Sequence, residues 1–197
     1  MTTTLLIASS NPGKLREIQD ILGETPFHLI LPAQLGLQLE VAETGQTYQE
    51  NAALKATAYA LASGLLTLAD DSGLEVAALG GQPGLHSARY APWPKATDAD
   101  RRRYLLQNLQ GRPRPWPARF YCAVAIAAPG RELQFFAGQV SGEIVPEERG
   151  SGGFGYDPLF YMPEFGQTMA ELPEAEKNRI SHRARAIQAA LPYLLSL

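Results

Sequence analysis

The sequence contains a single cysteine, Cys122, which excludes an intramolecular disulfide and a zinc site built from several thiolates. Charged residues make up only 19% of the chain, the net charge is −3 and there is no basic block, so broad capture of nucleic acid is not expected. No apolar run approaches the ~20 residues that cross a bilayer, and no basic region precedes an apolar stretch at the N-terminus. We therefore expect a soluble, cytoplasmic protein that partners neither nucleic acid nor a membrane.

A length of 197 residues suits one domain, 1–197, which can have two lobes and a sizeable core. Apolar strands alternate with helical segments in the first half, and alternating hairpin-like runs follow, so the pattern predicts an α/β fold with a mixed sheet. The expected strands are Thr4–Ala8, His28–Leu31, Leu65–Ala69, Arg119–Ala127 and Leu133–Ala137, with Gly138–Val145 as a candidate extension. The expected helices are Pro12–Leu22, Tyr48–Ser63, a segment from the Thr97–Asp100 capping box to about Leu109, and Ser181–Leu195, disturbed near Pro192. The expected loops include Gly80–Pro94, Gly111–Pro117 and Ser151–Tyr161, and Cys122 is expected in the core.

A polar turn, Ser9–Lys14, lies between the first strand and the first helix. Asn11 is suited to cap the helix and Pro12 to its first position. Backbone N–H groups, the positive helix end and Lys14 favour a phosphate at this turn, although the spacing is not that of a Walker A loop. The alternative is a solvated ion pair of Lys14 with Glu17, three residues away on the same helix face.

Two consecutive carboxylates, Asp70 and Asp71, end an apolar strand just before Ser72 and Gly73. The carboxyl end of a buried strand is where open α/β sheets bind ligands. Since side chains alternate along a strand, at most one of the two faces the site directly. Carboxylates suit Mg²⁺ and can also orient or deprotonate a water molecule. The alternative is an Asx turn that merely closes a loop.

Acidic residues also precede Thr44-Gly45, where Glu40 and Glu43 could lend a second metal ligand or be solvated charges. Glu50, Asn51 and Lys55 then frame the start of the next expected helix.

The segment Ser151–Pro158 combines three glycines with two aromatic residues. Glycine lets backbone approach a ligand closely, and the rings of Phe154 and Tyr156 offer flat faces for a base, worth about 1–3 kcal/mol per stacked base. Asp157 can accept a hydrogen bond from a ring N–H. The alternative is a hairpin loop pinned by two buried aromatic side chains.

Basic residues gather between Lys177 and Arg185, where His182 and Arg183 at the start of a helix could read a base edge or a phosphate. For Arg179 and Arg185 a solvated helix surface is the expectation. Together the segments supply a phosphate seat, an acidic centre, a stacking loop and basic residues. These parts suit direct attack of water on a nucleoside triphosphate.

Five blocks of this sequence closely resemble the inosine/xanthosine triphosphate pyrophosphatase family. The blocks are Ser9–Glu17, Ala69–Leu74, Gly84–Tyr90, Gly152–Pro158 and Ser181–Arg183, and they follow the family's order through nearly the whole chain. The resemblance implies hydrolysis of ITP, dITP and XTP to the monophosphate and pyrophosphate, dependence on Mg²⁺, and a homodimer. It also implies an elongated, two-lobed ITPase-like fold with the substrate cleft between the lobes.

The resemblance further implies a role for each site residue. It assigns triphosphate binding to Ser9, Ser10, Asn11, Pro12, Gly13 and Lys14, metal binding and general base catalysis to Asp71, and a substrate contact to Ser72. It assigns the purine to Phe154, Gly155, Tyr156 and Asp157, and completion of the pocket to Lys177, His182 and Arg183. Some relatives have two adjacent glutamates where this chain has Ala42-Glu43; we take Glu43 as the second metal ligand.

Two other functions remain open from the residues. One is a pyrophosphatase for other modified nucleotides, such as methylated pyrimidines. The other is a regulatory module that binds nucleotides without turnover, although a pure phosphate binder gains little from the Asp70-Asp71 pair.

Overall fold

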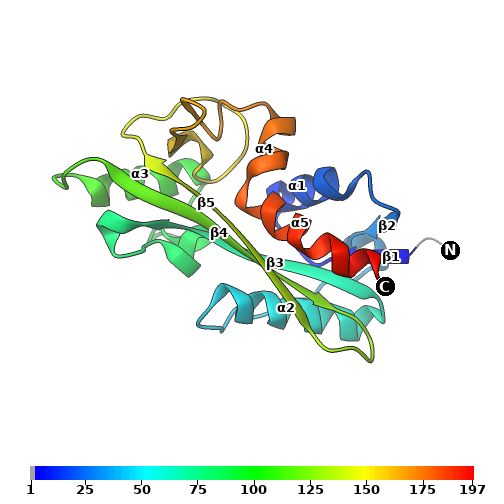
Figure 1. The fold of residues 1–197 in the computed structure, drawn as a ribbon. Coiled ribbons are helices and arrows are strands. Elements are labelled where there is room, and N and C mark those ends of the chain that lie inside the picture. Colours follow the sequence, from blue (N-terminus) through cyan, green and yellow to red (C-terminus); the bar gives the residue numbers. More distant parts are fainter. Residues whose placement is uncertain (1–2) are drawn as a thin grey trace. The chain divides into compact units, whose positions relative to one another are not determined.

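The computed structural model describes residues 3–197 and shows a mixed α/β fold. The strands are β1 (Thr3–Ile7), β2 (Phe27–Ile30), β3 (Leu66–Val76), β4 (Trp116–Ala127), β5 (Gln134–Ile144), β6 (Phe160–Met162) and β7 (Gln167–Thr168). The helices are α1 (Pro12–Leu22), α2 (Tyr48–Ser63), α3 (Asp98–Leu109), α4 (Glu174–Ile180) and α5 (His182–Leu195). Short 3₁₀ helices span Pro32–Leu35, Ala77–Leu79, Gly84–Arg89 and Asp157–Leu159. These elements confirm the predicted fold class (Figure 1).

Within the described residues the strands form one sheet in the order β2-β1-β3-β4-β5-β6-β7. Strand β1 pairs in parallel with β2 and with β3, whereas β6 pairs antiparallel with β5 and with β7. The sheet is therefore mixed, as the alternation of segment types predicted.

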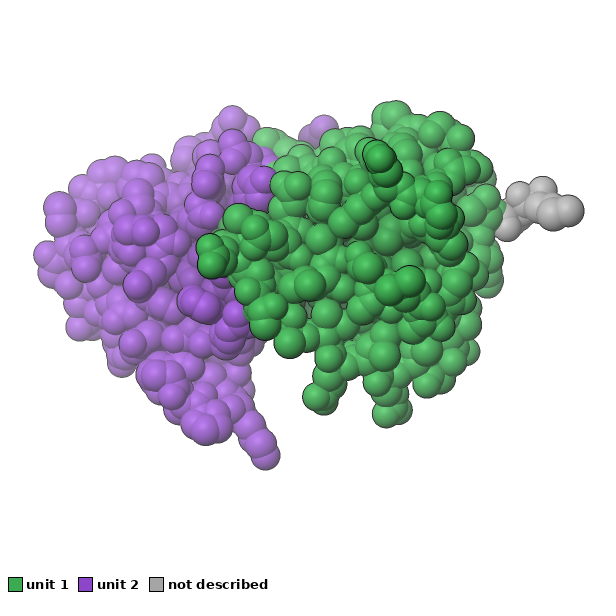
Figure 2. Space-filling view, turned by 90° about the horizontal axis from the view of Figure 1, so that it is seen from below, with its two compact units in different colours: residues 1–71, 122–138, 182–197 green, residues 72–121, 139–181 purple. Residues whose placement is uncertain are grey.

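The chain divides into two compact units, coloured separately in Figure 2. Unit 1 contains the residues up to Asp71 together with Cys122–Gly138 and His182–Leu197, and unit 2 contains Ser72–Tyr121 and Gln139–Ser181. Strands β3, β4 and β5 contribute residues to both units.

Unit 1 packs apolar side chains on both faces of its strands. In β1, Leu5 and Ile7 contact residues of α1 and α5, whereas Leu6 and the adjoining Ala8 contact residues of α2. Figure 1 shows α1 and α5 on one side of these strands and α2 on the other. Successive side chains of a strand point to opposite faces. A strand that packs against helices on both faces is therefore apolar along its whole length.

Unit 2 has a core of its own, formed by the later part of β3, by β4 and β5, and by α3. Its aromatic centre is the pair Phe120 and Phe160, with ring centroids 4.5 Å apart, and Leu105 and Leu109 of α3 are fully buried against it. Each unit therefore has an independent hydrophobic core.

Local capping signals set the ends of the long helices. Asn11 Oδ1 accepts hydrogen bonds from the backbone N–H groups of Gly13 and Lys14, and Thr97 forms a reciprocal capping box with Asp100. Helix α2 ends at Gly64, whose φ of 71° lies in the left-handed region that glycine tolerates. The predicted bounds of α1 and α2 are confirmed.

Two expectations about the chain's organisation are wrong, and three short elements were missed. Strand β3 does not end before Asp70 but continues to Val76, because Leu74 and Val76 alternate into the core of unit 2. Strand β4 begins inside the expected loop, at Trp116, whose indole donates to the carbonyl of Arg112. The short elements α4, β6 and β7 were not predicted, since so few residues give no clear periodicity.

Cys122 is fully buried, as expected for a core residue. Among residues 3–197 no helix is long and apolar enough to cross a membrane.

Candidate active site

The Ser9–Lys14 turn is shaped by its own side chains. Ser9 Oγ accepts from the N–H of Asn11 at 3.2 Å, and Asn11 in turn accepts from Gly13 at 2.9 Å and Lys14 at 3.2 Å. Two of the amides that were expected to face a phosphate thus serve the helix cap in this structure. The Lys14 ammonium brings a full positive charge to the turn and lies 3.1 Å from Asp70 Oδ2.

Asp70 and Asp71 point to opposite faces of β3, as alternation along the strand predicted. Asp70 faces α1 and α5, where its Oδ2 meets Lys14 and, at 3.2 Å, Arg183 Nε. Asp71 faces α2, where its Oδ2 accepts from Asn51 Nδ2 at 3.1 Å and its Oδ1 lies 3.8 Å from Lys55 Nζ. The carboxylates therefore occupy two different environments.

Asp70 is held in its ionised form. Burial by itself would raise the pKa of this carboxyl, but the charges of Lys14 and Arg183 outweigh burial and hold the pKa well below its usual range. Asp70 is thus a fixed negative charge beneath the Ser9–Lys14 turn.

Asp71 shifts in the other direction. Burial raises its pKa and the nearby charge of Glu43 adds to the effect, whereas Lys55, Lys14 and the Asn51 hydrogen bond only partly oppose it. A carboxylate with a raised pKa accepts a proton more readily, which is what a general base requires.

Lys55 connects Asp71 to the acidic loop. Its Nζ lies 2.7 Å from Glu43 Oε1, so one ammonium serves both carboxylates that the sequence nominated as metal ligands. The acidic loop is held against α2 at Gly45, whose N–H donates to Asn51 Oδ1 at 2.8 Å. A Cβ at Gly45 would lie 2.6 Å from the Cβ of Glu50, so a larger residue would push the loop away from α2.

A buried ion-pair network lies behind the turn. Arg183 is 1% exposed, and its guanidinium contacts both Asp70 and Glu17. Burial would lower the pKa of this group, but the two carboxylates raise it, so Arg183 carries a permanent charge. Glu17 therefore contributes to the network around Asp70 and not simply to a surface pair with Lys14.

The Gly152–Asp157 loop of unit 2 is built around another ion pair. Asp157 Oδ2 accepts from Lys177 Nζ at 2.5 Å and from the N–H of Phe154 at 2.8 Å. The same ammonium lies 5.2 Å from the centre of the Phe154 ring, a cation–π distance. Gly153, with φ of 68°, is essential here, because a Cβ would lie 2.1 Å from Asp157 Oδ2.

The two aromatic residues of this loop differ in accessibility. Phe154 is partly exposed, whereas Tyr156 is 4% exposed, packs in the core of unit 2 and donates from its hydroxyl to the carbonyl of Ser87 at 2.9 Å. The expectation of two flat faces needs a correction: core packing covers the Tyr156 ring, and Phe154 is left as the stacking surface.

Comparison with known proteins now decides the family. The sequence model of the Ham1 family matches residues 5–193. The chain belongs to the Ham1 family. It is 46% identical over 185 residues to the dITP/XTP pyrophosphatase of Listeria monocytogenes serotype 4b, an alignment that covers 93% of this chain and 91% of the relative. It is 47% identical over 190 residues to a dITP/XTP pyrophosphatase of Thermus thermophilus, covering 95% and 89%.

A solved structure gives the same result for the fold. The Ham1 protein of Staphylococcus aureus superposes with a TM-score of 0.86 at 41% sequence identity, over 98% of this chain and 99% of that one.

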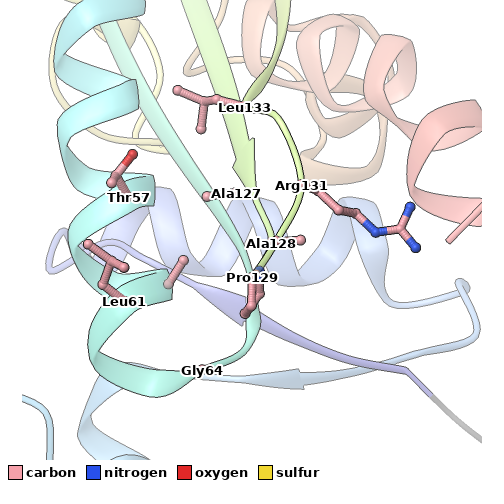
Figure 3. A pocket seen from close by; sticks show the side chains of 10 residues that line it. Thr57, Leu61, Gly64, Ala127, Ala128, Pro129, Arg131 and Leu133 are labelled. Atoms are coloured by element: carbon pink, nitrogen blue, oxygen red, sulfur yellow. The ribbon is translucent and has the colours of Figure 1, made fainter.

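The nominated residues of this Ham1-family chain are divided between the two units. Unit 1 holds Ser9, Ser10, Asn11, Pro12, Gly13, Lys14, Glu43, Asp71, His182 and Arg183, and unit 2 holds Ser72, Phe154, Gly155, Tyr156, Asp157 and Lys177. The cavity of unit 1 shown in Figure 3, about 340 Å³ between α2 and the β4–β5 turn, is lined by none of them.

Sequence reasoning noted Asn51 and Lys55 without assigning them to the site of this Ham1-family protein. Both contact Asp71, from positions one helical turn apart on α2. The i, i+4 spacing of an amide and a lysine just after an acidic loop was the signal that could have found them.

Proposed function

We propose that this chain hydrolyses deaminated purine nucleoside triphosphates, namely ITP, dITP and XTP, to the monophosphate and pyrophosphate. The observation that carries the proposal is the arrangement in β3, where Asp70 pairs with Lys14 beneath the Ser9–Lys14 turn and Asp71, on the opposite face, shares the Lys55 ammonium with Glu43. Family membership and relatives named dITP/XTP pyrophosphatase support the substrate class.

In this proposal the turn from Ser9 to Lys14 holds the triphosphate. Water attacks the α-phosphorus, and its proton passes to the Asp71 carboxylate. The bond from the α-phosphorus to the bridging oxygen breaks, and that oxygen leaves with pyrophosphate. Lys14 stabilises the negative charge on the phosphates, while Asp70, itself held by Arg183, keeps the Lys14 ammonium at the turn.

The carboxylates of Asp71 and Glu43 would hold Mg²⁺, which uses one or two protein carboxylates and completes its shell with water and substrate phosphates. The fit rests on the convergence of the two carboxylates, because Glu43 Oε1 and Asp71 Oδ1 lie 2.7 Å and 3.8 Å from the same Lys55 Nζ. No group of three His, Cys, Asp or Glu residues suited to a metal occurs within residues 3–197. When bound, Mg²⁺ would neutralise charge that develops on the phosphates.

The base is assigned to Phe154, Gly155 and Asp157 of the glycine loop, with Ser72, Lys177 and His182 completing the pocket. Phe154 supplies a partly exposed ring, and Lys177 a buried ammonium beside it. A 6-oxo purine accepts a hydrogen bond where adenine presents an amine, and one missed buried hydrogen bond costs about 1–3 kcal/mol. The burial of Arg183 favours an indirect role for it, through Asp70.

A substrate panel tests the proposal. Purified protein with Mg²⁺ should release pyrophosphate from ITP, dITP and XTP at least about tenfold faster than from ATP or GTP. Equal rates on all five would refute the specificity, faster turnover of methylated pyrimidine triphosphates would move the substrate class, and tight ITP binding without turnover would indicate a regulatory module.

Replacement of the proposed base is the matched test of mechanism. Asp71→Asn should lower kcat by a factor of about 10²–10⁴ and leave nucleotide binding measurable by calorimetry. Asp20→Asn, an exposed carboxylate on α1, is the control and should retain full activity. Near-normal turnover of Asp71→Asn would remove this residue from the mechanism.

The proposal includes a homodimer that works in the cytoplasm and takes only small-molecule substrates. Light scattering of the purified protein at micromolar concentration tests the dimer, which should give twice the mass of the chain.

A further inference from the structure

The first turns of α3 hold the glycine loop of unit 2 by its backbone. Asp98 Oδ2 accepts from the N–H of Gly155 at 2.8 Å, and Arg102 Nη1 donates to the carbonyl oxygen of Gly155 at 2.8 Å. The two residues are four positions apart and so lie on one face of α3. Neither residue belongs to the blocks that identified the family.

These two contacts fix two consecutive peptide planes. The N–H of Gly155 belongs to the peptide bond with Phe154, and its carbonyl to the peptide bond with Tyr156. Gly155 has φ of 62°, a conformation open to glycine and unfavourable for most other residues. Fixing both planes at a glycine removes the freedom that such a residue otherwise gives to a loop.

The guanidinium of Arg102 is itself anchored. Its Nη2 donates to Glu148 Oε2 and its Nε lies close to Glu148 Oε1, each at 2.9 Å. A two-point contact of this kind sets the plane of the guanidinium as well as its position. The carboxylate of Asp98 is anchored likewise, because its other oxygen contacts Arg101. The two contacts to Gly155 are therefore made by side chains that are already oriented.

Holding Gly155 determines where Phe154 lies. On one side of Gly155 the Tyr156 hydroxyl is tied to Ser87, and on the other the Phe154 ring lies against Lys177. A rotation about Gly155 would leave Tyr156 in the core but turn the Phe154 ring away from the ammonium.

We propose that Asp98 and Arg102 are positioning residues that hold Gly155 and thereby keep Phe154 in its base-binding orientation. The part that concerns the base rests on the proposed function, whereas the restraint on the loop does not. Asp98 and Arg102 touch no substrate and act through the backbone of Gly155. Their loss should weaken the binding of a base to the Phe154 ring more than it reduces stability.

The experiment uses two variants that remove a contact, Asp98→Ala and Arg102→Met, and one conservative variant, Asp98→Asn, which keeps an acceptor oxygen. The control is Asp100→Ala, which breaks the capping box of the same helix without touching Gly155. Amide hydrogen exchange of residues 152–157 is measured without nucleotide, and KM and kcat are measured separately for ITP.

We expect Asp98→Ala and Arg102→Met to raise exchange in the loop about tenfold and to raise KM for ITP by a similar factor, with a smaller change in kcat. Asp98→Asn should recover most of both, and Asp100→Ala should change neither, even where it lowers the melting temperature. Unchanged exchange in Asp98→Ala and Arg102→Met, or equal effects in Asp100→Ala, would overturn the proposal. So would faster exchange with an unchanged KM for ITP.

Failure of the proposed function and failure of the restraint on the loop give different results. A parent protein that shows no preference for ITP refutes the proposed function. The exchange measurement then still decides whether Asp98 and Arg102 restrain the loop.

Discussion

Arg183 shows at the scale of one residue how a buried charge is made tolerable. Its guanidinium is shared by Glu17 and Asp70, and Lys14 adds a second cation next to Asp70. A single buried ion is costly, but the members of this network satisfy one another. The network connects α1, α5 and the part of β3 that belongs to unit 1.

The stability cost of removing the cation together with one partner should be smaller than the sum of the costs of the two separate removals. Arg183→Met leaves Glu17 and Asp70 without their shared cation and should lower the free energy of unfolding by about 3–5 kcal/mol. The double variant Glu17→Gln/Arg183→Met should lose less than the sum of the two single variants. Urea titrations of the four proteins measure this coupling, and strict additivity would contradict it.

Asp98 provides a prediction about pH. Burial by itself would raise the pKa of its carboxyl, but the N–H of Gly155 and the contact with Arg101 hold the pKa below the ordinary value of 3.8. A carboxyl with a lowered pKa stabilises the fold above its unfolded-state pKa, and this stabilisation is lost as pH falls through the folded-state value. Because the side chain is more than one third exposed, the effect is small.

Asp98→Asn should therefore melt about 1–2 °C below the parent protein at pH 6 to 7. The difference should shrink as the pH falls below about 4. Melting curves across this range test the sign, and a difference that grows toward acid would contradict it.

At the scale of elements, the start of α5 depends on a glycine that follows the first residues of β5. A Cβ at Gly138 would lie 2.3 Å from the carbonyl oxygen of His182 and 2.4 Å from the nitrogen of Ala186. Only a residue without a side chain lets this strand come so close to the first turn of the helix, which carries His182 and Arg183.

Gly138→Ala should therefore displace α5, lower the free energy of unfolding by about 1–3 kcal/mol and reduce pyrophosphate release. Gly23→Ala is the control, since φ at Gly23 is −60° and the nearest atom to an added Cβ is 3.1 Å away. Its effect should stay within about 0.5 kcal/mol. Full activity and stability of Gly138→Ala would show that the helix adjusts freely.

Sequence patterns predicted elements wherever the decisive signal was local. Asn11-Pro12, Gly64, and Thr97 with Asp100 mark helix ends directly, and these helices begin or end where expected. The roles of the site residues, inferred from short blocks, stay predictions. What could not be predicted were the partners, because Glu17 and Arg183 are 166 positions apart and Asp98 and Gly155 are 57 apart. Such pairs depend on the tertiary fold and leave no periodicity in the sequence.

At the scale of the whole molecule, the path of the chain ties the two units together. The chain passes from one unit to the other at Asp71–Ser72, Tyr121–Cys122, Gly138–Gln139 and Ser181–His182. Three of these passages lie within strands β3, β4 and β5, so continuous backbone hydrogen-bonding elements are shared. We expect the two units to unfold together.

The two tryptophans, Trp93 and Trp116, both belong to unit 2, which makes the test simple. Tryptophan fluorescence reports on unit 2, whereas far-ultraviolet circular dichroism reports on the helices of both. Urea titrations followed by the two signals should superimpose. Separate midpoints would show that the units unfold independently.

The same path has a consequence for how the protein is made. Every residue of unit 2 has been synthesised once Ser181 has been added to the growing chain, but unit 1 still lacks Ala186, Ile187, Ala190 and Leu194 of its core. The carboxylates of Glu17 and Asp70 also have no ion-pair contact with Arg183 until that residue has been added. Although its first strand is translated early, the part of the protein proposed to grip the triphosphate is completed last. A chain truncated before Arg183 therefore lacks the cation that balances these carboxylates. Its unit 1 core is incomplete, which would make it a substrate for quality-control proteases.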